Sequence, residues 1–512
     1  MTFLEKLLNY YSISEEEHAR EASFSSLSFL PDISGCDEVQ KAIARLRLAK
    51  DKKERVLIYG DYDCDGIMAT SITKMALSRF GIAADTYIPS RYLDGYGINA
   101  KAVERVASDC DLIFTVDNGV AALDAIQAAA EKHIDIIVLD HHSYETAPEP
   151  VVALVHPRTV GLDDPSVSAG FLSYLFSHAL LGDRDPYFAV LGAMSLISDA
   201  MELENYNRLA VRLALRLLNR IRYSAISLLT EATFIDEKVL GMEIIPKINA
   251  VGRVETTSKI NVLIKYFCED DPVFRAEISE YLFAVNSERK TLTREAAERF
   301  PTCEEAAAVV VSDLPEGLNG LLASRLLDQF DRPVAVLSPD SKSEGVLVGS
   351  LRSREGFSIT DFFATLPFTP LAGGGHAYAG GISIRAEDFD AFKSAFIAFA
   401  ENHPLQKETV EAIPIALSDI TMENYKILRS FGPFGQGHRA PIFALTVNAS
   451  ALRYSYDGKR LQTPLGQNAR LFSFRFGRGS LPEMGTVTLL VEFNLHEWRE
   501  KFTLSADVVD AK

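Results

Sequence analysis

The feature that most constrains the fold of this chain is a series of short apolar runs between Val56 and Val155 that alternate with longer stretches of helical character. The strand-like runs are VLIY, DTYIP, DLIFTV, IDIIVL and VVALV. Between them, segments such as GIMATSITKMALSRF and AALDAIQAAAEK carry apolar residues at helical spacing. This alternation is typical of repeated βαβ units, so the sequence predicts a parallel sheet with helices packed against it.

The rest of the chain changes character twice. With 512 residues, of which 47% are apolar, several domains are expected. After Pro186 the pattern is almost wholly helical, and a charged stretch at 272–300 predicts a connecting helix. A second α/β pattern begins near Ala306, and short, regularly spaced strand-like runs after Ile413 predict a small all-β domain. We therefore predict domains at 1–271, 301–405 and 406–512, with the helix 272–300 between the first two.

Composition limits the classes of protein to consider. The five cysteines are scattered without a C-x-x-C pair, which argues against a zinc knuckle or a disulfide framework. The N-terminus lacks a secretory pattern and no long apolar run indicates a membrane span, so we expect a cytoplasmic protein without membrane contact. The net charge of −18 argues against bulk electrostatic coating of nucleic acid. Any nucleic-acid site must therefore be local.

Acids and histidines directly follow the predicted strands of the first domain. The carboxyl ends of parallel strands meet at one edge of a sheet and form its ligand crevice, so we expect these side chains to converge. A further acid ends an apolar helical run in SLISDAM and is expected to face the same crevice. The residues in question are Asp61, Asp63, Asp65, Asp117, Asp140, His141, His142 and Asp199.

Such a cluster calls for a cation, because carboxylates that converge without nearby Lys or Arg repel one another. Carboxylates with one or two imidazoles suit Mn²⁺ or Mg²⁺ better than Zn²⁺. A single D-x-D is more often a solvated turn or a helix cap, and a single Asp-His pair is more often a surface hydrogen bond. Because several such motifs each follow a buried strand in one βαβ array, the sequence favours a metal site.

The same motifs carry a family resemblance. GDYDCDG, VDNG, LDHH and SD resemble, in order, the motifs of the DHH phosphoesterases. YIPSRYLDGYG, PKINAVGR, GSLRS, GGGHAYAGG and GPFGQGHRAPIF extend the likeness to RecJ-like single-stranded-DNA exonucleases over nearly the whole chain. The resemblance implies a parallel-sheet DHH domain, a long helix, a smaller α/β DHH-associated domain and a C-terminal OB-like domain. It also implies a 5′-to-3′ exonuclease that acts in DNA repair and recombination.

The resemblance further implies roles for individual residues. Asp63 is expected to bind one of two Mn²⁺ or Mg²⁺ ions, while Asp65, His141 and Asp199 bind the other. Asp117 would bridge the two ions. His142 would lie near the substrate phosphate, and Asp61 would be a ligand or an orienting acceptor.

A second set of residues is expected to bind the substrate. Glycines allow a backbone to approach a phosphodiester, and Arg or His can bind its oxygens. The alternatives without a functional role are an ordinary turn for the glycines and a surface salt bridge for the arginine in NAVGR. The expected substrate-binding residues are His142, Arg253, Ser350, Arg352, Gly374, Gly375 and His376.

Two positions depart from the family pattern. Tyr59 stands where many DHH enzymes have a histidine ligand, four residues before the first acid of the D-x-D motif. We interpret it as weakening the first metal site, with Asp61 as compensation; the alternative is that Tyr59 faces the core of the sheet. The stretch 314–317, LPEG, replaces the Trp-His-Pro-Gly often found in RecJ sequences and puts local substrate contacts in question.

The third domain carries a basic segment interleaved with aromatic residues. Alternation in RLFSFRFG predicts that Phe472, Phe474 and Phe476 share one strand face in the core. Tyr454 and Tyr456 are expected to help stack and track single strands. Trp498 is expected to be structural. The basic residues are Arg453, Lys459, Arg460, Arg470, Arg475 and Arg478.

Three alternatives to an exonuclease stay open at this stage. They are a DHH phosphodiesterase for short oligonucleotides or cyclic dinucleotides, an inorganic pyrophosphatase, and a single-strand-binding protein that has lost catalysis. The OB-like segment favours a polymer substrate, and retention of the acids argues against lost catalysis because buried unpaired carboxylates are costly. Expected partners are single-stranded DNA and a single-strand-binding protein or helicase, with the chain itself a monomer.

Overall fold

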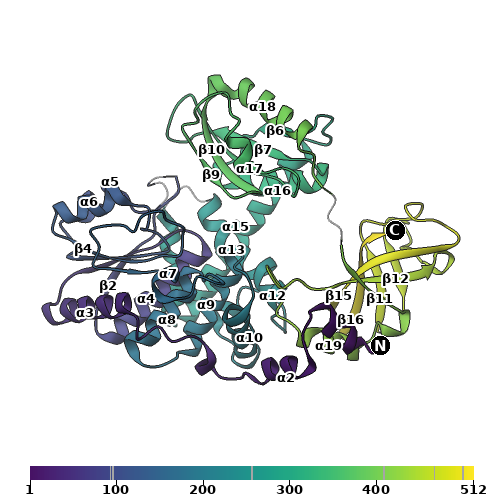
Figure 1. Ribbon diagram of the computed structural model, residues 1–512, viewed down its shortest axis with the longest axis horizontal. Helices are drawn as coiled ribbons and strands as arrows, with labels where there is room; N and C mark the ends of the chain where they lie inside the picture. Colours follow the sequence, from purple (N-terminus) through teal and green to yellow (C-terminus); the bar gives the residue numbers. More distant parts are fainter. Residues whose placement is uncertain are drawn as a thin grey trace.

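A computed structural model shows three domains arranged around one long helix (Figure 1). It describes residues 1–92, 94, 97–254, 258–406, 410–465, 468–498 and 501–511, without the side chains of residues 258, 497, 498 and 501. The predicted fold class is confirmed: a parallel-sheet domain, a smaller α/β domain and an all-β domain follow one another along the chain. Among the residues so described, no helix combines the length and apolarity needed to cross a membrane.

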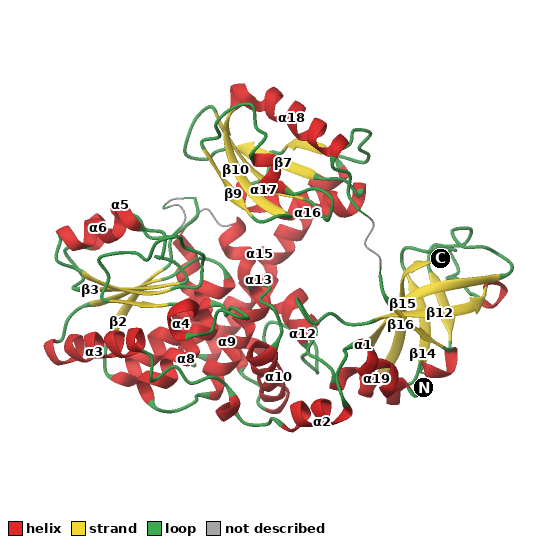
Figure 2. Cartoon of the chain, viewed as in Figure 1, coloured by secondary structure: helices red, strands yellow, loops and turns green. Residues whose placement is uncertain are grey.

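The first domain is built on a fully parallel sheet of order β2-β1-β3-β4-β5. Its strands are β1 Val56–Tyr59, β2 Ala84–Tyr87, β3 Leu112–Val116, β4 Asp135–Leu139 and β5 Ala153–Val155. One face packs on α5 Ala100–Val106 and α6 Leu123–Glu131; the other packs on α3 Asp37–Lys52 and α4 Cys64–Phe80 (Figure 2). Because both faces are covered, β1 and β3 are buried along their whole length.

The part of the first domain that follows β5, its helical half, encloses α4 on the side away from the sheet. Its main helices, α8 Ala169–Leu181 and α9 Pro186–Ser198, pack against α4 and are apolar nearly all round, as expected for helices in a core. The remaining helices are α7 Pro157–Val160, α10 Asn205–Arg220, α11 Ser224–Ser227, α12 Glu237–Val239, the π-helical turn η2 Leu240–Ile244, α13 Ile245–Val254, η3 Ser258–Asn261 and α14 Val262–Cys268. The connecting helix α15 spans Pro272–Glu298 and begins at an Asp271 cap.

The second domain is a mixed sheet of order β6-β7-β8-β10-β9, in which only β6 and β7 are parallel. Its strands are β6 Ala308–Val311, β7 Val334–Pro339, β8 Val346–Arg352, β9 Ala372–Gly375 and β10 Ala379–Arg385. Its helices are η4 Glu316–Leu318, α16 Asn319–Phe330, α17 Ile359–Phe363, η5 Ala386–Asp388 and α18 Phe389–Asn402. Strands β9 and β10 lie on the side of this domain that faces the first domain (Figure 1).

The third domain is a six-stranded sheet of order β11-β12-β15-β16-β14-β13. Its strands are β11 Ala412–Ile415, β12 Ile442–Asn448, β13 Leu461–Pro464, β14 Ala469–Ser473, β15 Thr486–Trp498 and β16 Lys501–Ala511. Its helices are η6 Leu417–Asp419, α19 Met422–Ser430 and η7 Ala449–Ala451. The strand-like run ALRYSY at residues 451–456 is one of those expected after Ile413, but it forms only a single bridge, between Tyr454 and Leu461.

The prediction that three phenylalanines share the core of this domain is wrong for two of them. The core residue of β14 is Leu471, so alternation along the strand directs Phe472 and Phe474 to the opposite face. Phe472 is buried but packs edge-on against Phe474 at a ring-centroid distance of 4.7 Å, and Phe474 is 74% exposed. Phe476 is partly buried and packs against the core. Tyr456 is fully exposed, and the side chain of Trp498 lies outside the described residues.

The N-terminal helix α1, Phe3–Tyr10, belongs physically to the third domain. Phe3 stacks on Phe443 and Phe493 at ring-centroid distances of 5.5 and 6.0 Å, and Leu7 is fully buried in the same core. The chain then runs through α2 Glu15–Ser23 and η1 Leu27–Phe29 to reach the first domain (Figure 1). The predicted boundary 1–271 therefore does not describe the packing, because residues at both ends of the chain build one core.

We predict that Phe3→Ala destabilises the third domain by about 3–5 kcal/mol, because the substitution empties a buried aromatic site. Denaturant unfolding measures this loss, with unfolding of the domain detected as proteolytic cleavage within residues 412–511. Leu417→Ala, at a leucine of the same domain that is 47% exposed, is the control and should shift stability by less than about 0.5 kcal/mol. Equal effects of the two substitutions would contradict the assignment of α1 to this core.

Candidate metal centre

The acids of GDYDCDG reach the edge of the sheet because the chain turns directly from β1 into α4. Asp63 caps α4: its Oδ1 accepts the backbone N–H groups of Asp65 and Gly66 at 3.0 and 3.2 Å. A Cβ at Gly66 would lie 2.6 Å from the carbonyl oxygen of Asp61, so only glycine allows the helix to start this close to the loop. The turn therefore holds all three acids within one short segment.

His141 lies at the centre of the first group of potential ligands. Its Nε2 is 3.5 Å from Asp65 Oδ2, 3.4 Å from Asp117 Oδ1 and 3.5 Å from Asp199 Oδ2. Ligands about 2.1–2.2 Å from a shared ion, at cis or tetrahedral angles, lie roughly 3.0–3.6 Å apart. The separations therefore suit atoms that bind one ion between them.

Asp65 is fixed in this group by the helical half of the domain. Its Oδ1 accepts hydrogen bonds from the Gly170 backbone at 2.7 Å and from Ser195 Oγ at 2.5 Å, and its Oδ2 accepts one from Ala169 N at 2.9 Å. A Cβ at Gly170 would lie 2.6 Å from Ser195, so this approach also requires glycine. Helices α8 and α9 thus orient a carboxylate that is supplied by α4.

A second group combines Asp61, Asp63 and Asp117, whose oxygens lie within 4.8 Å of one another. Asp61 Oδ1 and Asp117 Oδ1 are buried and accept no hydrogen bond within the described part of the chain. Buried carboxylate oxygens without donors are costly unless a cation binds them. Because Asp117 lies in both groups, the geometry fits two ions that share this carboxylate. The residues present therefore fit Mn²⁺ or Mg²⁺.

Asp117 also has an unusual backbone. Its φ is +60°, in the left-handed region that Asp and Asn adopt more readily than most residues. Its N–H donates to the Leu139 carbonyl at the end of β4, which holds the turn after β3 against the neighbouring strand. A strained backbone of this kind persists only where the surrounding structure fixes it, as the hydrogen bond to Leu139 does here.

The electrostatics of the carboxylates point in the same direction. Burial, followed by repulsion from Asp65 and Asp63, raises the pKa of Asp117 well above its usual value. Burial and Asp63 do the same to the pKa of Asp61, and burial with Asp65 raises that of Asp63. For Asp199, burial and the charges of Asp65 and Asp63 raise the pKa to about 8. Without a cation, these groups therefore favour their protonated forms.

Asp140 has a different role from the other acids. It accepts the backbone N–H groups of Val120, His141 and His142 at 3.0, 2.7 and 3.1 Å, and a ring hydrogen bond from His142 Nδ1 at 2.8 Å. Burial alone would lower the pKa of His142, but the hydrogen bond and charge of Asp140 raise it to about 9. Asp140 thus orients both histidines and favours a protonated His142 at the rim of the site.

A cationic side faces the carboxylates across a small pocket. The pocket has a volume of about 90 Å³, and all the described residues that line it come from the first domain. Two arginines line this pocket. Arg253 is among the substrate-binding residues expected from the sequence, whereas Arg91, whose Nη2 donates to Tyr62 Oη at 2.7 Å, is not. The motif YIPSRYLDGYG contains Arg91 and was the available signal. Asn249, which accepts the Cys64 N–H at 2.7 Å, was missed as well.

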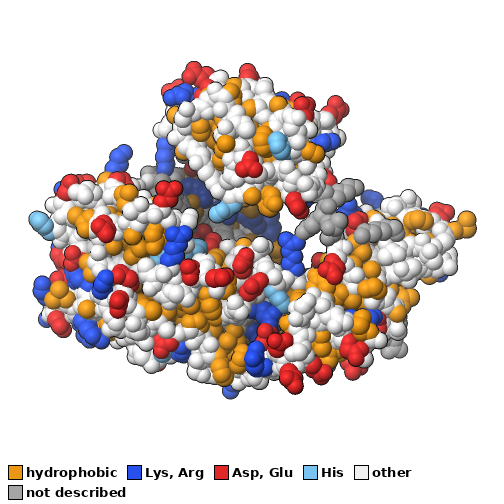
Figure 3. All heavy atoms as spheres, in the orientation of Figure 1, with side chains coloured by type: hydrophobic (Ala, Val, Ile, Leu, Met, Phe, Trp, Pro, Cys, Tyr) orange, Lys and Arg blue, Asp and Glu red, His pale blue; other side chains and the backbone are white. Residues whose placement is uncertain are grey.

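The predicted residues of the second domain gather in a separate patch. Gly381 of β10 pairs with both Ser350 of β8 and Gly374 of β9, and Gly380 pairs with Gly375. Arg352 pairs with Ala379, whose carbonyl accepts the His376 N–H at 2.8 Å. The patch therefore spans three adjacent strands. Its residues do not line the pocket of the acids. A hollow opens between the two domains (Figure 3).

The two departures from the family pattern have structural explanations. Tyr59 is fully buried, its ring lies 5.4 Å from that of Tyr87, and its hydroxyl donates to the Gly97 carbonyl at 3.3 Å. Of the two alternatives, the structure supports a core position, so Tyr59 is not an empty ligand position. In the LPEG stretch, a Cβ at Gly317 would lie 2.6 Å from the Arg253 carbonyl oxygen. The backbone of this stretch, which belongs to the second domain, therefore packs directly against the segment of the first domain that carries Arg253.

Comparisons with known proteins match three family profiles along the chain: the DHH family, N-terminal domain, at residues 55–186, the DHHA1 domain at 305–402 and the RecJ OB domain at 412–510. Single-stranded-DNA-specific exonuclease RecJ of Bacillus subtilis is 28% identical over 492 residues, which cover 90% of this chain. The alignment spans 62% of that relative's length.

Two solved structures are also similar. RecJ in complex with Mn²⁺ from Thermus thermophilus superposes with a TM-score of 0.84 at 23% identity, over 100% of this chain and 76% of the other. An exonuclease RecJ bound to manganese gives a TM-score of 0.63 at 26% identity, over 74% of this chain and 97% of the other. The first likeness supports the fold over the whole length of the chain.

We predict that Asp117→Asn lowers Mn²⁺ affinity and reduces phosphodiester hydrolysis at least about 100-fold, a barrier increase of about 2.7 kcal/mol. Asparagine keeps the shape and tolerates the left-handed backbone but removes the charge shared by the two groups. Calorimetric Mn²⁺ titration and a hydrolysis assay measure the two effects. Asp85→Ala, an exposed acid on β2, is the control, and a variant that keeps more than a tenth of the activity would contradict the bridging role.

We predict that Mn²⁺ binding releases protons and strengthens as pH rises towards about 8, the raised pKa of Asp199. The stability of the metal-free protein should change in the opposite sense. A carboxyl with a raised folded-state pKa keeps a proton that the unfolded chain loses near pH 4, so stability falls between about pH 4 and 8. Melting curves against pH, with and without Mn²⁺, check both signs. Pure stabilisation on raising pH without metal would contradict the raised values.

Proposed function

We propose that this chain, which belongs to the DHH family and carries a DHHA1 domain and a RecJ OB domain behind its DHH domain, is a metal-dependent exonuclease that hydrolyses phosphodiester bonds of single-stranded DNA. We further propose 5′-to-3′ cleavage and a role in DNA repair and recombination, as the RecJ resemblance implies. The observation that carries the proposal is the position of Asp117, which lies in both ligand groups beside His141.

The proposed ligand roles divide the carboxylates between two ions. Asp65, His141 and Asp199 hold one ion, Asp61 and Asp63 hold the other, and Asp117 is shared. When bound, two ions supply an activated water and neutralise the charge that develops on the phosphoryl oxygens. The protein contributes a set of ligands that its backbone hydrogen bonds already orient, as those to Asp63 and Asp65 indicate.

The cationic side of the pocket is proposed to hold the scissile phosphate. Arg253 is half-buried near Arg91, and desolvation together with that like charge lowers its pKa; an anionic phosphate would relieve this repulsion. His142, held protonated by Asp140, offers a charged hydrogen-bond donor at the same rim. Ser350, Arg352, Gly374, Gly375 and His376 are proposed to bind the adjoining strand from across the hollow.

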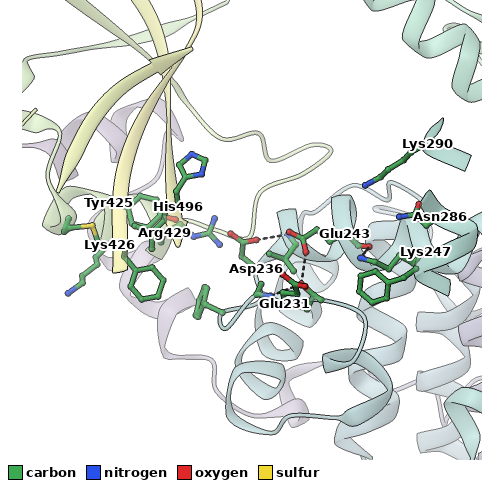
Figure 4. A pocket seen from close by; sticks show the side chains of 18 of the residues that line it. Glu231, Asp236, Glu243, Lys247, Asn286, Lys290, Tyr425, Lys426, Arg429 and His496 are labelled. Atoms are coloured by element: carbon green, nitrogen blue, oxygen red, sulfur yellow. Dashed lines mark hydrogen bonds between the residues drawn. The ribbon is translucent and has the colours of Figure 1, made fainter. Parts of the chain in front are cut away.

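A polymer substrate is supported by a second, larger cavity. It has a volume of about 1270 Å³ and lies between α15, the end of the first domain and the third domain (Figure 4). Lys247 and Lys290 line one wall, and Lys426 and His496 line the other. We propose that the three lysines follow the phosphates of a strand, while the exposed Tyr456 and Phe474 stack on bases elsewhere on the third domain.

The mixed charge of this cavity argues against a metal centre there. Three acids line it together with the lysines: Glu231, Asp236 and Glu243. Of these, Glu231 and Glu243 are exposed on the surface of the first domain. The carboxylate pocket, although much smaller, has buried oxygens without donors and is therefore the proposed site of chemistry. A monomeric state and a single-strand-binding protein or helicase as partner stay predictions.

The test compares end-labelled substrates in Mn²⁺. The purified protein should degrade a 5′-labelled single strand from that end, spare the matching duplex, and act less efficiently on a dinucleotide. Asp117→Asn should be inactive on all of these substrates. Preference for the dinucleotide would favour the short-oligonucleotide phosphodiesterase instead, and tight strand binding without cleavage would indicate lost catalysis.

A further inference from the structure

The glycine-rich stretch of the motif GPFGQGHR contacts the segment that carries Asp199. Asp199 caps the end of α9, and the next residues, 200–203, lead into α10. Leu203 N donates to the Gln436 carbonyl at 2.7 Å. A Cβ at Gly435 would lie 2.7 Å from Leu203 Cδ1, and one at Gly437 would lie 3.3 Å from Glu202 Cβ. The backbone of the third domain therefore lies directly against this turn.

The turn after Asp199 has a strained backbone. Helix α9 ends with hydrogen bonds from Ala200 N to the Ile197 carbonyl and from Met201 N to the Leu196 carbonyl, the pattern of a left-handed cap. Glycine is usual at the left-handed position, but here it is Ala200, with φ of +50°. Asn207 supports the turn from within the first domain through the Glu202 carbonyl. External support from the third domain therefore bears on a conformation that alanine adopts at a cost.

Charged contacts fix the supporting loop to the first domain. Arg429 makes a two-pronged ion pair with Glu237, at 2.6 and 2.7 Å, and Glu237 also accepts the Phe434 N–H at 3.2 Å. Arg212 Nε and Nη2 donate to the Gly432 carbonyl at 3.1 and 3.0 Å. Because Glu237 is almost fully buried, the geometry of this pair is more constrained than that of a surface pair. These contacts hold the part of the loop that directly precedes its contact with residues 202–203.

We propose that the loop Gly432–Gly437 of the third domain is a positioning element for the metal site, which holds the turn after α9 and thereby fixes the Asp199 carboxylate. The inference rests on the metal role proposed for Asp199. It assigns the glycines of GPFGQGHR to close backbone packing between domains. The loop acts through residues 200–203 and touches neither the ion nor the substrate.

The test is Gly435→Ala, assayed by calorimetric titration of the full-length protein with Mn²⁺ and no DNA. The added methyl collides with Leu203, so we expect the dissociation constant of one ion to rise at least fivefold, while that of the other changes less. Hydrolysis of a short oligonucleotide should fall at low Mn²⁺ and recover as Mn²⁺ is raised. Gly35→Ala is the matched control, because a Cβ there meets no atom within 4 Å, and should leave both constants unchanged.

Glu237→Gln provides a second variant that keeps the side-chain shape and leaves Leu203 untouched. It should also raise the dissociation constant of the same ion, because it weakens the contact that holds the loop against the first domain. If folded Gly435→Ala and Glu237→Gln bind Mn²⁺ like the wild type and lose only affinity for long strands, the loop merely seats the third domain and the inference is overturned. A wild-type protein that binds two ions but leaves single strands intact would contradict the proposed exonuclease activity, while the comparison of Mn²⁺ affinities would still decide the role of the loop.

Discussion

The repulsion among buried carboxylates at the carboxyl edge of the first sheet is the constraint on which the rest of the site depends. Asp61, Asp117 and Asp140 are almost fully buried within a few residues of strand ends. Of these three, only Asp140 obtains enough donors to favour the charged form: the N–H groups of its own loop, that of Val120 in the loop after β3, and the protonated ring of His142. The other carboxylates need either protons or divalent cations. Their arrangement around His141 favours cations.

Satisfying that constraint requires support from outside the strand loops. Asp65 is oriented by backbone N–H groups at the start of α8 and by Ser195 of α9, while Asp199 comes from the end of α9. The helical half is therefore part of the site and not only a cover for the sheet. The contact between Leu203 and the loop of the third domain extends the same support to a domain none of whose described residues lines the pocket.

The distribution of charge also explains how an acidic protein can offer a site for a polyanion. The overall charge is −18, yet Arg91 and Arg253 lie beside the carboxylates, and lysines line the cavity between α15 and the third domain. With cations bound, the acids of the first domain no longer repel a phosphate. The arginines beside the carboxylates, and the lysines among the mixed charges of the cavity, would then be the contacts for the phosphates of the proposed strand.

The sequence alone determined the order of the domains, the strands of the first sheet and the convergence of its acids and histidines, because these depend on local periodicity and on the rule that parallel strands end at one edge. It could not decide the orientation of Tyr59, the exposure of Phe474 or the role of Arg91, since each depends on neighbours distant in the chain. Nor could it show that Phe3 completes a core formed by residues after Ile413. Contacts between residues hundreds of positions apart leave no periodic signal, so only the tertiary structure decided how the two ends of the chain meet and how the third domain reaches the turn after Asp199.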